Sequence, residues 1–180
     1  MHLSWSQKIF LRLNKHLGES AGRDRFMSFL AHDLIAMMFG FFALWVGLLG
    51  IFFPRGAAGF VGFITLSFFF SYLMSYAIGL LWPHHRPIVE LRRVKQLFRP
   101  FGAWKSFPSD HTIAVTIMTA AVVVARVPVW FFFIVCCASG AVALGRVYAG
   151  VHYPRDILGG IVIGVIGTFL AYSIVYPSYL

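Results

Sequence analysis

The residues of this chain that could do chemistry gather in three short clusters. The clusters combine histidine, arginine, serine and aspartate, which are residue types that bind an anion and transfer a proton or a covalent group. They are His84-His85-Arg86-Pro87, Pro108-Ser109-Asp110-His111, and a segment that opens with Gly145-Arg146 and ends with His152 and Asp156.

The first two clusters, together with Arg146, contain groups that suit phosphate oxygens. Arg86 and Arg146 each offer a planar fork of donors. Pro108-Ser109 before an apolar run predicts the start of a helix, with Ser109 or Asp110 as its N-cap. The free N–H groups and the positive dipole at such a helix start favour a bound phosphate.

The two histidines and one carboxylate could carry out group transfer. His111 and His152 can each shuttle a proton, and one of them could act as a nucleophile. Asp156 follows His152 by four residues, so a turn or helix would bring its carboxylate to the imidazole and fix the tautomer. Taken singly, His152 could instead be a packing residue and Arg146 a lipid head-group anchor. Together these residues indicate phosphoryl transfer. No cluster resembles a metal cage of carboxylates or thiolates, so we expect neither a metal nor another cofactor.

The elements that position these clusters are membrane-spanning helices. Apolar residues make up 59% of the 180 positions, charged residues only 12%, and the mean hydropathy is +0.80. A span needs about 20 mostly apolar residues, and runs of that kind cover residues 34–54, 56–83, 127–145 and 157–177. A fifth run, 112–125, reaches that length if its helix begins near Ser109 and continues past Arg126. We therefore predict one all-α domain over residues 1–180, a polytopic bundle of about five transmembrane helices. Gly159, Gly160, Gly164 and Gly167 are expected to let helices pack closely.

Residues 1–33 differ from the rest of the chain. Apolar side chains such as Trp5 and Phe10 alternate with cations such as Lys8 and Arg12. This pattern is typical of an amphipathic helix that lies in the membrane interface. We predict such a helix over residues 1–33, and a transmembrane bundle over residues 34–180.

Five spans place the clusters on one side of the membrane. The only long loop, 83–108, and the junction 148–156 then emerge on the same face, which the N-terminus shares. A site built from both segments is therefore possible.

The charge balance limits the partners. The chain has 15 Lys and Arg residues against six carboxylates, which suits anionic lipid head groups or a phosphate-bearing substrate. Nucleic acid is not an expected partner, because the cations sit between membrane-length apolar runs. The sequence does not determine the oligomeric state. A group of loop cations outside the clusters could face lipid head groups or recognise a pyrophosphate: Arg92, Arg93, Lys95, Arg99 and Lys105.

The three clusters resemble the signature motifs of the type 2 phosphatidic acid phosphatase (PAP2) superfamily. These motifs read Lys-x6-Arg-Pro, Pro-Ser-Gly-His and Ser-Arg-x5-His-x3-Asp. The third is matched in spacing from Arg146 through His152 to Asp156, and the second at Pro108, Ser109 and His111. The first is matched only at Arg86-Pro87.

The resemblance implies a lipid-phosphate substrate and a role for each matched residue. His152 would attack phosphorus and become a phosphohistidine, oriented by Asp156. His111 would protonate the leaving oxygen and then activate water. The non-bridging oxygens would be held by Arg86, Ser109 and Arg146.

Three departures from the motifs refine this reading. Gly79 stands where the family has lysine, Gly145 where it has serine, and Asp110 where it has glycine. The Pro-Ser-Asp-His form without the lysine resembles the bacterial undecaprenyl-diphosphatase branch. The missing lysine could be replaced by Lys105 or by one of the neighbouring histidines, His84 or His85, although each also fits a solvated loop residue.

The sequence leaves the substrate and the orientation open. An undecaprenyl (polyprenyl) diphosphate phosphatase is favoured. The alternatives are a phosphatase of phosphatidylglycerophosphate, phosphatidate or a lipid A phosphate, and a non-catalytic lipid-binding or transport protein. The expected location is the cell membrane, with the site at the interface. An excess of Lys and Arg on the motif-bearing face points to the cytoplasm, whereas the resemblance points to the outer face, which we favour.

Overall fold

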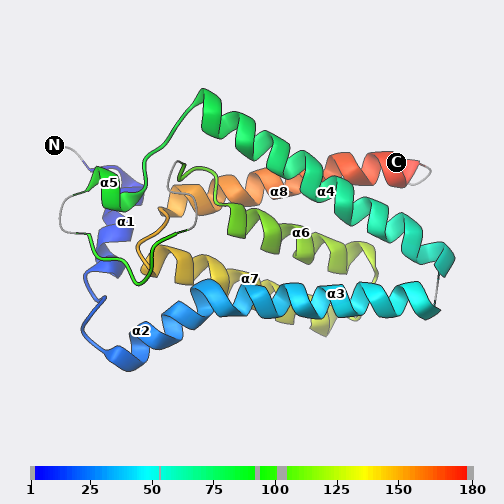
Figure 1. The fold of residues 1–180 in the computed structure, drawn as a ribbon, viewed down its shortest axis with the longest axis horizontal. Coiled ribbons are helices and arrows are strands. Elements are labelled where there is room, and N and C mark those ends of the chain that lie inside the picture. The colour runs from blue at the N-terminus through cyan, green and yellow to red at the C-terminus, as the bar shows by residue number, and fades with distance from the viewer. Residues whose placement is uncertain (1–2, 53, 92–93, 101–104, 178–180) are drawn as a thin grey trace.

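The computed structural model describes residues 3–52, 54–91, 94–100 and 105–177, and within these ranges the chain forms helices and loops without a β-strand. Figure 1 shows an elongated bundle of roughly parallel rods with most of the loop segments at one end. The all-helical membrane fold expected from the apolar runs is confirmed.

Four helical segments are long and apolar enough to cross a membrane. They are Ala21–Phe52, Gly56–Leu81, Val129–Tyr148 and Pro154–Val175. The first contains α2 (Ala21–Ser28), a π-helical turn η1 (Phe29–Asp33) and α3 (Leu34–Phe52). The others correspond to α4 (Pro54–Leu81), α7 (Val129–Tyr148) and α8 (Pro154–Val175). The chain is therefore a multi-pass membrane protein.

The fifth apolar helix is shorter than expected. Helix α6 (Asp110–Val124) does begin just after Ser109, but Ala125 caps its C-terminus and Arg126 has a φ of 51°. The expected continuation past Arg126 is therefore wrong. Fifteen residues make a rod of about 22 Å, less than the roughly 30 Å of hydrocarbon. Helix α6 packs against α8, α7, α4 and α3, so it is a central helix enclosed by its longer neighbours.

The N-terminal segment is divided differently from the expected single interfacial helix. Helix α1 (Trp5–Asn14) carries a capping box between Ser4 and Gln7. The chain then turns at Gly18, whose φ is +91°. Helix α2 follows, with Ser20 as its N-cap. Residues 21–33 continue into the first span. The face that α1 buries is mainly polar and contacts the protein: Ser6, Gln7, Phe10 and Asn14.

Small residues let α8 approach α4 and α6 closely. A Cβ on Gly167 would collide with Ser71 of α4. A Cβ on Gly160 would lie 2.7 Å from the carbonyl oxygen of Ser109. The packing role expected of these glycines is confirmed, and it brings the start of α8 to the start of α6.

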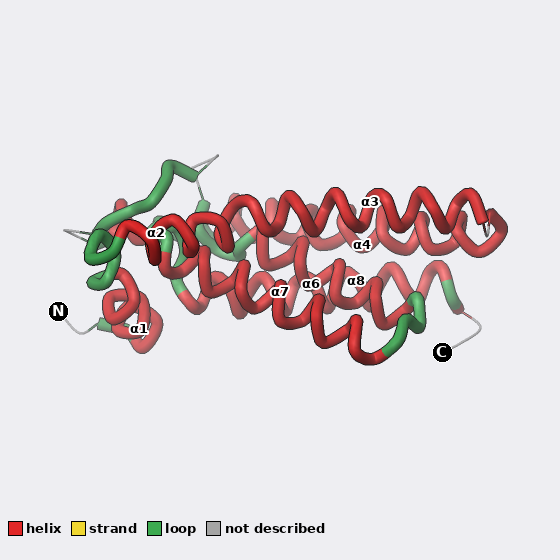
Figure 2. Tube along the Cα trace, turned by 90° about the horizontal axis from the view of Figure 1, so that it is seen from below, coloured by secondary structure: helices red, strands yellow, loops and turns green. Residues whose placement is uncertain are grey.

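The helices form two layers. Helices α3 and α4 lie on one side, and α6, α7 and α8 lie on the other (Figure 2). Helices α3 and α4 come together at the end away from the loops and diverge toward the loop end (Figure 1).

The segments that hold the clusters meet at one end of the bundle, as expected. The N–H of Leu97 donates to the carbonyl oxygen of Ala149 at 3.1 Å, which joins the long loop to the turn between α7 and α8. Asn14 of α1 exchanges two hydrogen bonds with the backbone of Lys95, of 2.8 and 3.1 Å. The short helix α5 (Pro87–Glu90) lies at the same end (Figure 1).

Candidate active site

His152 lies in the tight turn between α7 and α8. Gly150 gives this turn its shape, with a φ of +80° and a Cβ position that would collide with the carbonyl oxygen of Lys95. Only glycine adopts this conformation readily. The turn buries the His152 side chain to 3% exposure, so its imidazole is held in one place.

The two ring nitrogens of His152 face different partners. Nδ1 lies 3.5 Å from Oδ2 of Asp156, which is longer than a good hydrogen bond. Nε2 lies 3.5 Å from a terminal nitrogen of Arg86. Burial lowers the pKa of His152 to about 4, against the opposing effect of Asp156. The imidazole is therefore neutral at pH 7, and with its proton on Nδ1 the Nε2 lone pair points to the arginine side.

The Asp156 carboxylate is fixed by neighbours that the sequence did not indicate. It is fully buried, and its Oδ2 accepts from the Ser106 hydroxyl at 2.6 Å and from the N–H of Tyr153 at 2.9 Å. Ser106 precedes the second cluster by two residues and has no motif spacing that would single it out. Asp156 was identified correctly as a neighbour of His152, but its strongest partner comes from the loop.

Arg86 and Arg146 are both buried, with 6% and 3% exposure. A terminal nitrogen of Arg86 donates to the carbonyl oxygen of Val151 at 3.0 Å, and a terminal nitrogen of Arg146 donates to that of Ala31 at 3.2 Å. Burial lowers the pKa of Arg86, while Asp156 opposes the shift. The Nε of Arg146 has no hydrogen-bond partner among the described residues. Two buried guanidinium groups near each other favour an anion between them.

The second cluster forms the start of α6, as predicted. Ser109 is the N-cap, and its Oγ accepts from the N–H of Thr112 at 3.5 Å and from the Thr112 hydroxyl at 3.1 Å. Its own N–H donates to the carbonyl oxygen of Asp156 at 3.0 Å. The Ser109 hydroxyl proton can therefore point outward to an anion. His111 lies within electrostatic range of both arginines and of His152.

Two of the three residues considered as replacements for the motif lysine, Lys105 and His85, differ in environment. Lys105 is 7% exposed and contacts Ser75 and Asp110, each at 2.6 Å, so it is not a solvated loop residue. His85 is exposed. Its role stays a prediction.

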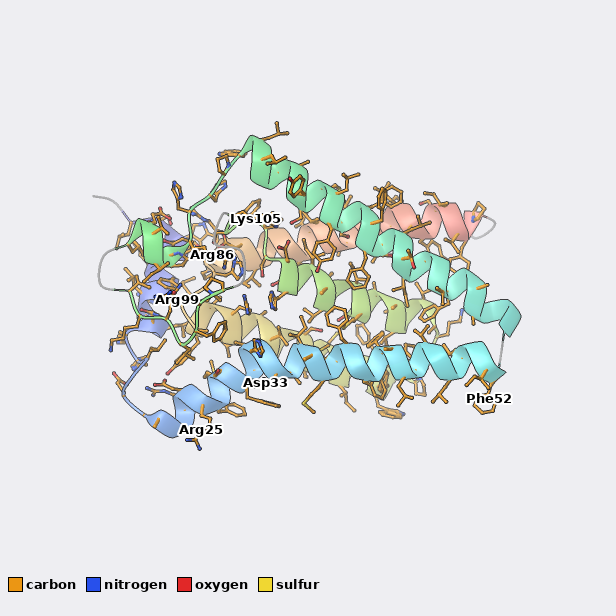
Figure 3. All side chains as sticks on the ribbon, viewed as in Figure 1. Arg25, Asp33, Phe52, Arg86, Arg99 and Lys105 are labelled. Carbon is orange, nitrogen blue, oxygen red and sulfur yellow. The ribbon has the colours of Figure 1, made fainter. Side chains whose placement is uncertain are left out.

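The loop cations outside the motifs divide into three groups. Arg92 and Arg93 lie outside the described residues. The Lys95 ammonium donates to the carbonyl oxygen of Leu17 at 2.7 Å and so holds the N-terminal turn. Arg99 is exposed at the same end of the bundle as Arg86 and Lys105 (Figure 3). Within the described ranges no three His, Cys, Asp or Glu side chains are grouped as a metal site.

Comparison with known families identifies the class. A model of the PAP2 superfamily matches residues 56–179, which is more than half of the chain, and the chain belongs to this superfamily. The matched range contains all three clusters, and the resemblance read from them is confirmed.

Relatives and solved structures of this class are similar to the chain. A protein of Escherichia coli K12, YbjG, provisionally named an undecaprenyl-diphosphatase, is 37% identical over 109 residues, which are 60% of this chain and 53% of YbjG. The undecaprenyl-diphosphatase BcrC of Bacillus subtilis is 33% identical over 99 residues, 54% of this chain and 49% of BcrC. The chain spans about half the length of these curated relatives.

Two crystal structures share the fold. Aquifex aeolicus LpxE superposes with a TM-score of 0.76 at 21% identity, covering 95% of this chain and 96% of LpxE. The PAP2-type phosphatidylglycerolphosphate phosphatase of Bacillus subtilis superposes with a TM-score of 0.55 at 22% identity, covering 94% and 93%.

Proposed function

We propose that this protein is a membrane phosphatase of lipid-linked phosphates, and that its substrate is a polyprenyl diphosphate of the undecaprenyl type, which it converts to the monophosphate. One observation carries the phosphatase activity in this proposal: a buried His152 has Asp156 near one ring nitrogen and Arg86 beside the other. This is the arrangement that a nucleophilic imidazole needs when it attacks an anionic phosphoryl group.

The first half of the proposed reaction forms a phosphohistidine. The Nε2 lone pair of His152 attacks the terminal phosphorus, and the bond from phosphorus to the bridging oxygen breaks. His111 is protonated once the anionic phosphate is bound beside it, because a nearby negative charge favours the imidazolium, and it gives its proton to the departing oxygen. Arg86, Arg146 and the Ser109 hydroxyl hold the non-bridging oxygens, whose charge they stabilise in the transition state. Asp156 stabilises the positive charge that the ring gains.

The second half releases inorganic phosphate. His111, now neutral, takes a proton from water while the water oxygen attacks phosphorus. The bond from phosphorus to Nε2 breaks, so His152 is again neutral and His111 is again protonated. In this scheme the arginines and the helix start neutralise the phosphate, and no step calls for a metal ion.

An apolar groove supports a lipid-linked substrate. Helices α3, α4 and α6 enclose a cavity of about 230 Å³ whose lining includes Phe39, Phe42, Phe68, Ile117 and Met118. On α6, Ile117 and Met118 follow His111 by six and seven residues, or about 10 Å of helix. Helices α3 and α4 diverge toward the site end (Figure 1). A hydrocarbon tail in this groove would leave its phosphate at the level of His111.

The diphosphate preference rests on the relatives and on charge. Both relatives described above carry undecaprenyl-diphosphatase in their names, and exposed Arg99 adds a cation at the site end. A phosphatase of phospholipid monoesters is the second candidate, because the chain has the fold of a phosphatidylglycerolphosphate phosphatase over 94% of its length.

The test is phosphate release by the purified protein. The panel is undecaprenyl diphosphate, phosphatidylglycerophosphate, phosphatidate and the soluble p-nitrophenyl phosphate, each with and without EDTA. We expect the highest kcat/KM for the diphosphate, survival in EDTA and inhibition by vanadate. His152→Ala should abolish turnover, whereas His16→Ala, which changes a histidine of the N-terminal segment, should not. A preference for phosphatidylglycerophosphate or phosphatidate would move the assignment to the second candidate. Turnover within tenfold of wild type in His152→Ala would remove its role as nucleophile.

A further inference from the structure

Lys105 sits in a closed polar triangle beside the start of α6. Its Nζ donates to Oγ of Ser75 and to Oδ1 of Asp110, each at 2.6 Å, and Ser75 Oγ donates to the same Oδ1 at 2.8 Å. A longer contact of 3.5 Å joins Nζ to the carbonyl oxygen of Pro108. The triangle therefore joins three segments: α4, the loop before the second cluster, and the first residue of α6.

The ammonium of Lys105 is directed to acceptors of the protein. A lysine has three N–H donors, and Ser75, Asp110 and Pro108 account for three acceptors around Nζ. Lys105 is also 7% exposed. These contacts give the cation an indirect route to a bound phosphate, through the groups that it holds.

Asp110 is the group of the triangle that carries a negative charge toward the two arginines. It lies directly between Ser109 and His111 in the chain, and its carboxylate is within electrostatic range of both Arg86 and Arg146. A carboxylate in that position repels the anion that the two arginines attract, and a nearby cation cancels this repulsion.

We propose that Lys105 is a positioning residue of the phosphate site: by neutralising Asp110, and by tying it to Ser75, it keeps the start of α6 receptive to the phosphate of the substrate. This inference rests on the proposed phosphatase function. It assigns Lys105 an indirect action, in contrast to a lysine that binds the phosphate itself. In this chain the charge pair of Lys105 and Asp110 would then stand in place of the two residues usual in the family, a glycine at position 110 and a lysine at position 79.

The test is a pair of substitutions made singly and together. Lys105→Met leaves the Asp110 charge uncompensated, and we expect KM to rise about tenfold, because a partly screened carboxylate then repels the phosphate. Lys105→Met/Asp110→Asn removes both charges, and we expect KM to return to within about threefold of wild type. Lys8→Met, an exposed lysine of α1, is the matched control with unchanged KM.

The double variant distinguishes three roles of Lys105. If Lys105 binds the phosphate directly, the double variant still lacks that contact, and its KM stays well outside the threefold range of wild type. If the triangle matters only for packing, the double variant is equally impaired or worse, since it lacks the same contacts. Either result overturns the proposal, and recovery in the double variant supports it.

Vanadate binding separates this proposal from the proposed function. Vanadate affinity, measured by calorimetry on the intact purified protein, needs no turnover. We expect weaker binding to Lys105→Met, near wild-type binding to the double variant, and equal or tighter binding to Asp110→Asn. Absence of lipid phosphatase activity with this order of affinities would refute the function alone. If Lys105→Met does not fold, the Asp110→Asn variant still tests the proposal. Weaker vanadate binding to Asp110→Asn than to wild type would contradict the proposal by itself.

Discussion

The site depends on one shared oxygen atom. Oδ2 of Asp156 accepts from Ser106 and from the N–H of Tyr153, and it is also the atom nearest Nδ1 of His152. The first two contacts fix the carboxylate before a substrate arrives. The orientation of the His152 ring therefore depends on Ser106, a residue that need not contact the substrate.

We predict that Ser106→Ala lowers kcat more than it raises KM. The hydroxyl makes a 2.6 Å bond to a fully buried carboxylate, and a hydrogen bond to a charged group contributes about 1.5–3 kcal/mol. A loss of about tenfold or more in kcat is expected. Ser173→Ala is the matched control, because that hydroxyl donates only to a carbonyl of its own helix, Phe169. Steady-state kinetics on both variants provide the measurement, and an unchanged kcat in Ser106→Ala would contradict the prediction.

The burial of His152 also predicts how stability varies with pH. Its pKa is lowered from 6.5 to about 4 in the folded protein. Between these values the unfolded chain binds a proton that the folded chain does not, so stability falls as the pH drops from about 6.5 to about 4. The His152→Gln variant lacks this pH-dependent contribution to stability. The Tm of wild type minus the Tm of His152→Gln should therefore decrease as the pH falls from 7.5 to 4.5. A constant difference would show that His152 takes up a proton as readily in the folded protein as in the unfolded chain.

At the scale of elements, the π-helical turn η1 forms one wall of the site. Its Ala31 carbonyl oxygen accepts from Arg146, and α7 packs directly on it at Gly145. A Cβ on Gly145 would lie 2.7 Å from the backbone nitrogen of Ala31. Glycine therefore replaces the usual serine of the motif because the backbone of η1 occupies the space. π-helical turns are often found at functional sites.

We predict that Gly145→Ser is harmful, although it restores the residue usual in the family. The added side chain would push α7 away from η1 and move Arg146 from its place in the site. Gly140→Ser on the same helix is the control, because nothing lies within 4 Å of a Cβ there. The expected result is a lower Tm and a loss of activity in Gly145→Ser alone, measured by thermal unfolding and phosphate release. A wild-type Tm and wild-type activity in Gly145→Ser would show that η1 moves to accommodate the added side chain.

The parts of the site that the sequence could predict are those set by short spacings. Arg146 lies at the end of α7, His152 in the turn that follows and Asp156 in the first turn of α8. Ser109 caps the helix that carries His111, so local rules were sufficient. The partners that hold them come from distant segments: Ser106 to Asp156, Ala31 to Arg146, and Ser75 to Lys105.

Such long-range contacts depend on helix packing, and no fixed spacing in the sequence indicates them. Two helix boundaries also escaped prediction. An Arg126 with positive φ ended α6, and the turn at Gly18 separated α1 from the helix that leads into the first span.

At the scale of the whole molecule, cations are concentrated at the site end. Of the 13 Lys and Arg residues that the structure describes, two, Arg55 and Arg126, lie at the opposite end, and the other 11 lie in segments of the site end. Several of these 11 donate hydrogen bonds to other groups of the protein. Six donate to identified protein groups: Arg23, Arg86, Lys95, Lys105, Arg146 and Arg155. These cations bind groups of the protein at the site and around it. Their number therefore overstates the excess of positive charge that determines the membrane topology.

We predict that the site end faces outward from the cell, as the resemblance to the diphosphatase branch implies. The bound cations weaken the opposite inference from the positive-inside rule. The test uses single cysteines in a background with Cys136 and Cys137 replaced by alanine. Lys8→Cys reports the site end and Arg126→Cys the other end, and both positions are exposed. A membrane-impermeant maleimide applied to intact cells should label Lys8→Cys only, and Arg126→Cys should react after permeabilisation. The reverse pattern would place the site in the cytoplasm and show that the unbound cations, such as Arg12, Lys15 and Arg25, determine the topology.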